Sequence, residues 1–286
     1  LERERPDIVS VATSAKPRPQ IVINCARAGV RAILAEKPIA FSLAETDAMI
    51  ETCHERGTIL AVGCTRRWDA YWNAAKALID AGEIGRVLQV TAYGRAAISH
   101  NGSHLLDLVR YLAGGEVSRV VGEAESDAHA AGDEDFMTNG YLAFDNGVRA
   151  YIRTWPTGGA EWNFEVVGET GRLRSIDNGG EIEWWQIVPG DKSGAQVRRA
   201  FPRPQRIESM GVRLVHDLIA AIETGKRPNC AGEDGRAALE IAIGLRESHR
   251  RGICRVDLPL PDRTQAIRSA ETLAGDLPVA LRRAKQ

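Results

Sequence analysis

The sequence predicts an α/β region followed by an α+β region: a partial doubly wound parallel sheet, then a mainly antiparallel open sheet with C-terminal helices. Three observations predict this order. Short apolar runs alternate with amphipathic stretches of about 10 to 15 residues up to residue 85, which is typical of a parallel sheet covered by helices. Strand-like segments then follow one another directly, as in antiparallel sheets. Two amphipathic stretches after residue 209 predict the closing helices.

In the first region, each strand is expected to lead into a helix. The apolar run 7–13 ends in the small hydroxyl residues Thr13 and Ser14. Ser42, with Glu45 three residues later, has the pattern of a capping box, which predicts a helix from there to about Arg56–Gly57. The other elements expected in this region are strands at 30–35 and 59–63 and helices at 20–28 and 68–81.

In the second region, a strand at 87–94 and a helix at 103–112 precede a succession of strands. Asn146-Gly147 predicts a hairpin, because these residues adopt the positive φ angles that a type I′ turn needs. The expected strands are 118–124, 136–144, 148–155, 162–167 and 181–188, followed by helices at 210–224 and 234–251 and an extended segment at 256–260. The charged tail after Pro278 is expected to be disordered.

Composition narrows the class of protein. The chain has 286 residues, 44% of them hydrophobic, and a formal net charge of -1, so we expect a large core and neither a nucleic-acid nor a membrane partner. Its five cysteines form no Cys-x-x-Cys, which favours free thiols in a reducing compartment. Residues 1–6 lack the apolar core of a signal peptide. The sequence therefore predicts a cytoplasmic protein.

The stretch Glu36-Lys37-Pro38 follows the apolar run 30–35. Charges in this position lie at the carboxyl end of a strand, where open α/β sheets bind their ligands. Lys37 is therefore expected to face a crevice, although a solvated loop lysine would give the same local pattern.

Three stretches together resemble one family. The first is 7–13 followed by Ala28-Gly29 and Glu36-Lys37-Pro38. The second is Gly102-Ser103-His104-Leu105-Leu106-Asp107. The third is 232–241, followed by Ser248, Gly252 and Leu258-Pro259-Leu260. In this order they cover nearly the whole chain and are similar to the glucose-fructose oxidoreductase / inositol dehydrogenase / rhizopine-catabolism (Gfo/Idh/MocA) family.

The resemblance implies an NAD(P)-dependent oxidoreductase that transfers hydride between nicotinamide and a sugar, a cyclitol or a related polyol. It implies that residues 1–85 form the later half of a Rossmann-like domain for NAD or NADP. It also implies that residues 86–286 form an α+β domain for substrate binding and oligomerisation, in a homodimer or homotetramer.

The resemblance also implies residue roles. Lys37 would hydrogen-bond the reacting oxygen, and His104 would be the acid/base, since an imidazole takes and gives protons near neutrality. Thr13, Ser14 and Glu36 would border the nicotinamide ribose. Arg66 is expected to contact the cofactor, and Arg67 and Asn101 the substrate. A surface ion pair is the alternative for either arginine.

Two departures from the family pattern stand out. The family commonly has an aspartate four residues before the catalytic histidine, and here that residue is His100, which cannot supply a fixed negative charge. One helical turn would still bring His100 near His104. With Asp107 as a third ligand, the same spacing is an alternative pattern for a metal site, but Asn101 stands where the metalloprotease motif requires a glutamate, so no metal is expected.

The second departure is that no Gly-x-Gly-x-x-Gly occurs in the sequence. That turn holds a dinucleotide's pyrophosphate at a helix N-terminus, so the chain is expected to bind a dinucleotide poorly. The chain also begins at Leu1 rather than Met. Two interpretations stay open: an N-terminally truncated enzyme, and a non-catalytic sugar- or partner-binding relative.

Overall fold

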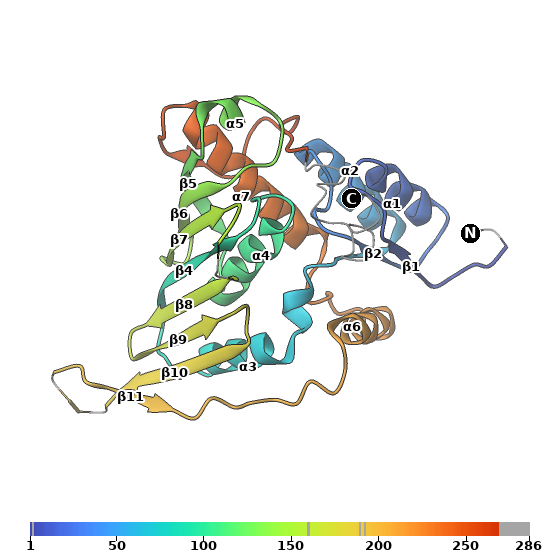
Figure 1. The fold of residues 1–286 in the computed structure, drawn as a ribbon. Helices are drawn as coiled ribbons and strands as arrows, with labels where there is room; N and C mark the ends of the chain where they lie inside the picture. The colour runs from blue at the N-terminus through green and yellow to red at the C-terminus, as the bar shows by residue number, and fades with distance from the viewer. Residues whose placement is uncertain (2, 159–160, 189, 192, 269–286) are drawn as a thin grey trace, which may run out of the picture.

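The computed structural model describes residues 1, 3–158, 161–188, 190–191 and 193–268, which form two sheets (Figure 1). The first sheet has the order β1-β2-β3, and both of its strand pairs are parallel. Its strands are Ile8–Val11 (β1), Ala32–Ala35 (β2) and Ile59–Val62 (β3), connected by the helices Arg18–Arg27 (α1) and Leu43–Arg56 (α2). The predicted strand–helix alternation is confirmed.

Helix α2 begins and ends where its sequence predicts. The Ser42 hydroxyl accepts a hydrogen bond from the Glu45 backbone N–H at 3.2 Å, and the Glu45 carboxylate accepts one from the Ser42 N–H at 3.0 Å. Gly57 ends the helix with a φ of 65°, a conformation that glycine adopts without a steric penalty.

The second sheet contains nine strands in the order β11-β10-β9-β8-β4-β7-β6-β5-β12, and of its pairs only β4–β7 is parallel within the described residues. The predicted open, mainly antiparallel sheet is confirmed. Its strands are Val87–Arg95 (β4), Val117–Ala124 (β5), Thr138–Phe144 (β6), Arg149–Trp155 (β7), Asn163–Gly168 (β8), Gly171–Ile176 (β9), Glu181–Ile187 (β10), Gln196–Arg199 (β11) and Val256–Asp257 (β12).

Two of these strands, β9 and β11, were not expected from the sequence. In β9 the buried Leu173 and Ser175 alternate with the more exposed Arg172 and Arg174, so its sequence has the period-2 pattern of a strand with one buried face. All four residues of β11 are exposed. That strand forms through its backbone pairing with β10 and has no buried face to mark it.

The β6–β7 hairpin forms where it was expected, but the predicted type I′ turn is wrong. Gly147, with a φ of 91°, is the loop residue with a positive φ, and the Gly147 N–H donates to the Phe144 carbonyl at 3.2 Å. The Phe144 N–H donates to the Val148 carbonyl at 3.0 Å. This is a three-residue loop in which one glycine supplies the left-handed residue that closes the turn.

The segment after β3 is not one helix from residue 68, as predicted. It is a 3-10 turn at Thr65–Trp68 (η1) followed by the helix Ala70–Asp80 (α3). Asp69 separates them, because its carboxylate accepts the backbone N–H groups of Tyr71 at 2.9 Å and Trp72 at 3.3 Å as an N-cap. Arg66 and Arg67 therefore lie on a tight turn directly beyond the strand.

The helix Gly102–Ala113 (α4) begins two residues after His100, which lies in a turn. The regular helical turn expected to connect His100 with His104 is therefore absent from this part of the described chain, although the charge of His100 still acts on His104. The remaining helices are Asp127–Ala131 (α5), Met210–Thr224 (α6) and Gly232–Arg250 (α7).

Helix α7 links the two sheets (Figure 1). It packs on β5 and α4 of the second sheet and also on α2 and β3 of the first. Just before it, the Cys230 carbonyl accepts the Val62 backbone N–H at 3.0 Å, so the chain leading into α7 lies beside β3. The carboxyl end of the first sheet is thereby fixed against the second.

The tail after Pro278, for which disorder was expected, lies outside the described residues. Within the part that the structure describes, no helix has both the length and the apolar character needed to cross a membrane.

Candidate active site

The carboxyl ends of the three parallel strands meet at one edge of the first sheet. The Glu36 N–H donates to the Val11 carbonyl at 3.2 Å, and the Gly63 N–H donates to the Ala35 carbonyl at 2.8 Å, so the residues beyond the strands stay in register. A side chain at Gly63 would begin 3.4 Å from Oε2 of Glu36. The strand order thus brings Glu36 and Lys37 to a polar edge, as predicted for this class of sheet.

Arg18, which the sequence reading passed over, ties the first two strand ends together. Its side chain is buried, and its guanidinium donates to the carbonyl oxygens of Thr13 and Pro38. Burial lowers the pKa of Arg18 to about 10, and the charge of Glu36 opposes that shift. Thr13 and Ser14 themselves are exposed beyond the end of β1.

Lys37 connects this edge to the second sheet. Its Nζ donates a hydrogen bond to Oδ1 of Asn101 at 3.1 Å. Asn101 occupies the N-cap position of α4 and therefore belongs to the turn that also carries His100. The structure brings Lys37, Asn101 and His104 together from segments more than 60 positions apart, a grouping expected from the resemblance alone.

His104 lies in the first turn of α4 and is 7% exposed. Its Nδ1 is buried and has no hydrogen-bond partner among the described residues. The pKa of His104 is lowered well below its ordinary value, first by burial and then by the charges of Arg66, Lys37 and His100. The imidazole is therefore neutral at pH 7 and can accept a proton.

Trp162 lies against both His104 and Arg66. Its ring centroid is 6.0 Å from that of His104, and the Arg66 guanidinium lies 4.9 Å above the Trp162 ring. Burial also lowers the pKa of Arg66, against the charges of Cys64, Asp69 and Glu161.

Arg66 also lines a cavity of about 510 Å³. Other residues that line it are Trp68, Trp72, Asn178 and Arg206. The cavity combines aromatic faces with polar groups that can donate and accept hydrogen bonds. Arg66 also lies over the Trp162 ring and so connects this cavity to the His104 group, although His104 and Lys37 are not among the described residues that line it.

Arg67 has a different role from either one considered in the sequence analysis. Its Nε and Nη2 donate to the two carboxylate oxygens of Asp107, each at 2.8 Å, and Nη2 also reaches Asp234 at 3.2 Å. Arg67 is 7% exposed and Asp107 is 1% exposed, so this is a buried ion pair and not a surface one. Arg67 joins η1 to α4 and α7, and its remaining nitrogen, Nη1, donates to the Asn229 carbonyl at 2.8 Å.

The contacts of Asp107 in this network also disfavour metal binding. Asp107 is not free on a polar helix face, because Arg67 binds both of its oxygens. Among the described residues, one group could present three metal-ligand atoms within 4.8 Å of one another, formed by Cys64, Asp107 and Cys230. Burial raises the pKa of the Cys230 thiol, and a guanidinium already neutralises the carboxylate, so this group does not favour a cation.

Asp135 is a residue of this region that the sequence reading missed. Its carboxylate accepts the backbone N–H of Ser99 at 2.8 Å and that of His100 at 2.7 Å. No local pattern could have found it, because it reaches the turn from 35 residues downstream.

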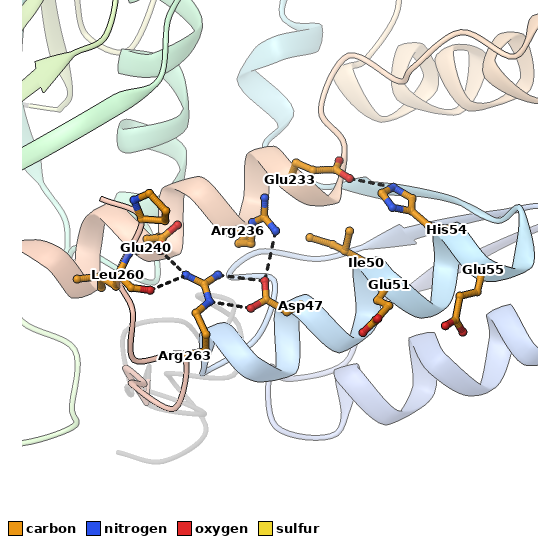
Figure 2. Close-up of a pocket in the computed structure, with 11 residues that line it drawn as sticks. Asp47, Ile50, Glu51, His54, Glu55, Glu233, Arg236, Glu240, Leu260 and Arg263 are labelled. Atoms are coloured by element: carbon orange, nitrogen blue, oxygen red, sulfur yellow. Dashed lines mark hydrogen bonds and ion pairs between the residues drawn. The ribbon is translucent and has the colours of Figure 1, made fainter. Parts of the chain in front are cut away.

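A second hollow lies elsewhere, between α2 and α7 (Figure 2). It measures about 740 Å³, and the charges on its walls pair with one another: Arg263 with Asp47 and Glu240, and His54 with Glu233. None of the site residues predicted from the sequence is among the described residues that line it. The polar group at the edge of the first sheet is therefore the better candidate for chemistry.

Comparisons with known proteins identify the family of this chain. Residues 1–64 match the family described as "Oxidoreductase family, NAD-binding Rossmann fold", and residues 72–174 match the "GFO/IDH/MocA C-terminal domain". The myo-inositol 2-dehydrogenase of Thermotoga maritima is 28% identical over an alignment of 274 positions that covers 87% of this chain and 79% of that protein. The D-apiose dehydrogenase of Paraburkholderia graminis is 28% identical over an alignment of 284 positions that covers 88% of this chain and 73% of that protein.

Solved structures share the fold. The aldose-aldose oxidoreductase of Caulobacter crescentus, complexed with glycerol, superposes with a TM-score of 0.74 at 24% identity, over 88% of this chain and 79% of that one. A levoglucosan dehydrogenase in complex with NADH gives a TM-score of 0.74 at 22% identity, over 88% of this chain and 80% of that one. From its two matching domains, its relatives and its fold, the chain belongs to the Gfo/Idh/MocA family of oxidoreductases.

Proposed function

We propose that this protein is an NAD(P)-dependent oxidoreductase that transfers hydride between nicotinamide and a CH–OH group of a sugar, a cyclitol or a related polyol. Relatives that are named as inositol and apiose dehydrogenases support this substrate class. The observation that carries the proposal is the hydrogen bond of 3.1 Å between Lys37 Nζ and Asn101 Oδ1, which places an ammonium group beside the turn that leads to the buried His104.

The residues of this chain suit the nicotinamide end of such a cofactor. The buried Nδ1 of His104 lacks a partner within the described residues, so one polar atom in this group is available to a bound molecule. Thr13, Ser14 and Glu36 would border the cofactor at the strand ends, with Lys37 and Arg66 beside them. When bound, the nicotinamide supplies the hydride acceptor or donor.

In the oxidation direction, His104 acts as the general base and Lys37 as the group that holds the reacting oxygen. A neutral imidazole can take the hydroxyl proton, which fits the lowered pKa of His104. The ammonium group of Lys37 then stabilises the charge that develops on the oxygen. Asn101 orients Lys37 through its amide oxygen.

The substrate occupies the space bounded by Trp162 and the cavity of about 510 Å³ that Arg66 lines. Aromatic faces and several hydrogen-bonding groups are what a polyol needs, since each hydroxyl must replace the water that it loses. Arg67 is not part of this pocket, because it is held in the ion pair with Asp107.

The organisation follows from the same proposal. Residues 1–85 contain the first sheet and form the cofactor-binding unit, and residues 86–286 contain the second sheet and form the substrate-binding and oligomerising unit. The resemblance to the family supports a homodimer or homotetramer. The five free cysteines support a cytoplasmic location.

The test is turnover of a panel of aldoses and cyclitols with NAD and with NADP, preceded by calorimetric binding of NADH and NADPH. The sequence lacks the Gly-x-Gly-x-x-Gly turn, so weak binding is expected. Turnover that Lys37→Ala abolishes would support the enzyme. Polyol binding with neither cofactor binding nor turnover would favour the non-catalytic relative.

A further inference from the structure

The turn before α4 is held by a carboxylate from a distant segment. Oδ1 of Asp135 accepts the Ser99 N–H at 2.8 Å, and Oδ2 accepts the His100 N–H at 2.7 Å. The Phe136 N–H adds a third hydrogen bond to Oδ1 at 3.0 Å. Backbone N–H groups aimed at both oxygens of a carboxylate make charge-assisted hydrogen bonds, which are shorter and stronger than those between neutral groups.

This carboxylate is also electrostatically coupled to Lys37. Burial raises the pKa of Asp135 to about 6, while the three backbone N–H groups and the positive charge of Lys37 oppose that rise. A group with a pKa of about 6 is mostly ionised at pH 7. Asp135 therefore places a negative charge beside a site that otherwise gathers Lys37, Arg66 and two imidazoles.

The segment that carries Asp135 is fixed from two sides. The Ile98 N–H donates to the Phe136 carbonyl at 2.8 Å, which pairs the segment with the turn itself. From the other side, Arg250 at the end of α7 donates to the Ala131 carbonyl at 3.1 Å and to the Gly132 carbonyl at 2.9 Å. Asp135 thus lies in a braced segment and not on a free loop.

We propose that Asp135 is a positioning residue for the reaction: it holds the turn at residues 98–101 so that Asn101 and His104 face Lys37. This inference rests on the proposed function. An aspartate at position 100 would carry a negative charge on the turn itself. Here the carboxylate comes from Asp135, which lies on a separate segment and accepts the backbone N–H of His100.

The first experiment concerns the anchor and needs no turnover. In the wild-type chain without cofactor, the backbone amide resonance of Ser99 is followed by NMR as the pH changes. It is expected to titrate with a midpoint at about 6 and to lose that titration in Asp135→Asn. A Ser99 amide that does not respond to pH in the wild type would overturn the anchoring role, and that outcome does not depend on the folding of any variant.

The second experiment concerns catalysis. Asp135→Asn keeps the size of the side chain but removes its charge. Its amide N–H₂ would face backbone N–H groups, and two donors cannot form a hydrogen bond with each other. We expect kcat to fall by about 10- to 100-fold, as for other residues that orient a catalytic group, with KM little changed. Asp145→Asn is the matched control. Its carboxylate also accepts a backbone N–H, that of Glu116 at 3.0 Å, but it lies in the β6–β7 hairpin.

The third experiment adds a carboxylate where the family commonly has one. His100→Asp is expected to recover part of the lost kcat in the Asp135→Asn background and to give no gain in the wild type. Equal effects of His100→Asp in both backgrounds, or a normal kcat in Asp135→Asn, would overturn the positioning role. A wild-type chain without turnover would overturn the proposed function and the catalytic half of this inference, while the amide titration alone decides the anchoring half.

Discussion

Lys37 Nζ lies 3.1 Å from Oδ1 of Asn101, and this hydrogen bond joins the edge of the first sheet to the turn that begins α4. The two residues come from different sheets, so the contact depends on α7, which packs on both. The geometry places a lysine at a strand end beside the turn that leads to the helix carrying His104.

Lys37→Ala is expected to lower kcat by about 10²- to 10⁴-fold, the usual contribution of a positioned proton donor or acceptor. The fold should survive, because Lys37 is only half-buried at the sheet edge. Steady-state kinetics with the best polyol of the panel provides the measurement. Lys16→Ala removes an exposed lysine from the same region and should leave kcat unchanged. A Lys37→Ala variant with near-normal turnover would exclude the role given to this residue.

Arg67→Met is expected to destabilise the protein by about 3 to 5 kcal/mol, because the buried Asp107 carboxylate loses both of its hydrogen bonds from Arg67 and keeps Arg110 as an ion-pair partner at the longer distance of 3.8 Å. Urea unfolding measures this difference. Arg86→Met serves as the matched control, since it breaks the exposed pair with Glu169 and should cost less than about 1 kcal/mol. Replacing Asp107 by leucine in the Arg67→Met background should recover part of the loss. If Arg67→Met were as stable as the control variant, the ion pair would not hold η1 to α4.

The parts of the fold that depend on residues close together in the chain could be predicted from the sequence. The Ser42–Glu45 capping box and the glycine at the end of α2 are recognisable from residues a few positions apart, and the structure contains both. The start of α4 is different. Helix ends shift by one or two residues depending on which donors are satisfied, and here the Ser99 and His100 N–H groups bind Asp135 instead of continuing a helix.

The candidate site was only partly predictable for the same reason. Lys37 could be placed by its strand end, and His104 by its motif. The partner of Arg67, by contrast, depends on a contact between η1 and α4, 40 positions away in sequence. Ion pairs of that separation leave no periodic pattern, so an arginine in the interior cannot be told from a surface arginine until the chain has folded.

Gly94→Ala is expected to destabilise the protein and to disturb the site. A Cβ atom at residue 94 would lie 2.5 Å from Cδ1 and 2.8 Å from the Cα of Trp162, so the tryptophan backbone would have to move. Overpacking of this kind costs about 1 to 3 kcal/mol. Trp162 contacts His104 and Arg66, so KM should rise as well. At Gly211, in the first turn of α6, the nearest atom to a new Cβ is Ser209 Oγ at 3.8 Å, so Gly211→Ala should be tolerated.

Asp135 should make the stability of the wild type fall as the pH rises from about 4 to about 6. Its folded-state pKa of about 6 lies above the ordinary value of 3.8, so between these values the folded state binds the proton that the unfolded state has lost. Chemical unfolding of the wild type and of Asp135→Asn at several pH values measures the difference. The wild type should lose stability relative to the variant across this window, by less than about 3 kcal/mol. A constant difference would contradict a raised pKa.

The pKa shift of His104 should make stability change with pH in the opposite direction to the shift of Asp135. Its pKa is lowered in the folded state, so the neutral form that the proposed base requires persists below the ordinary value of 6.5. The acid limb of kcat/KM for polyol oxidation is therefore expected below pH 6.5, and stability should be lost as the pH falls through the unfolded-state pKa of about 6.5. His104→Gln removes the base and should abolish that limb together with most of the turnover, while His129→Gln, at an exposed position on α5, should change neither. If the acid limb persisted in residual His104→Gln activity, the base would have to be a different group. The wild-type limb would then report that group's ionisation instead.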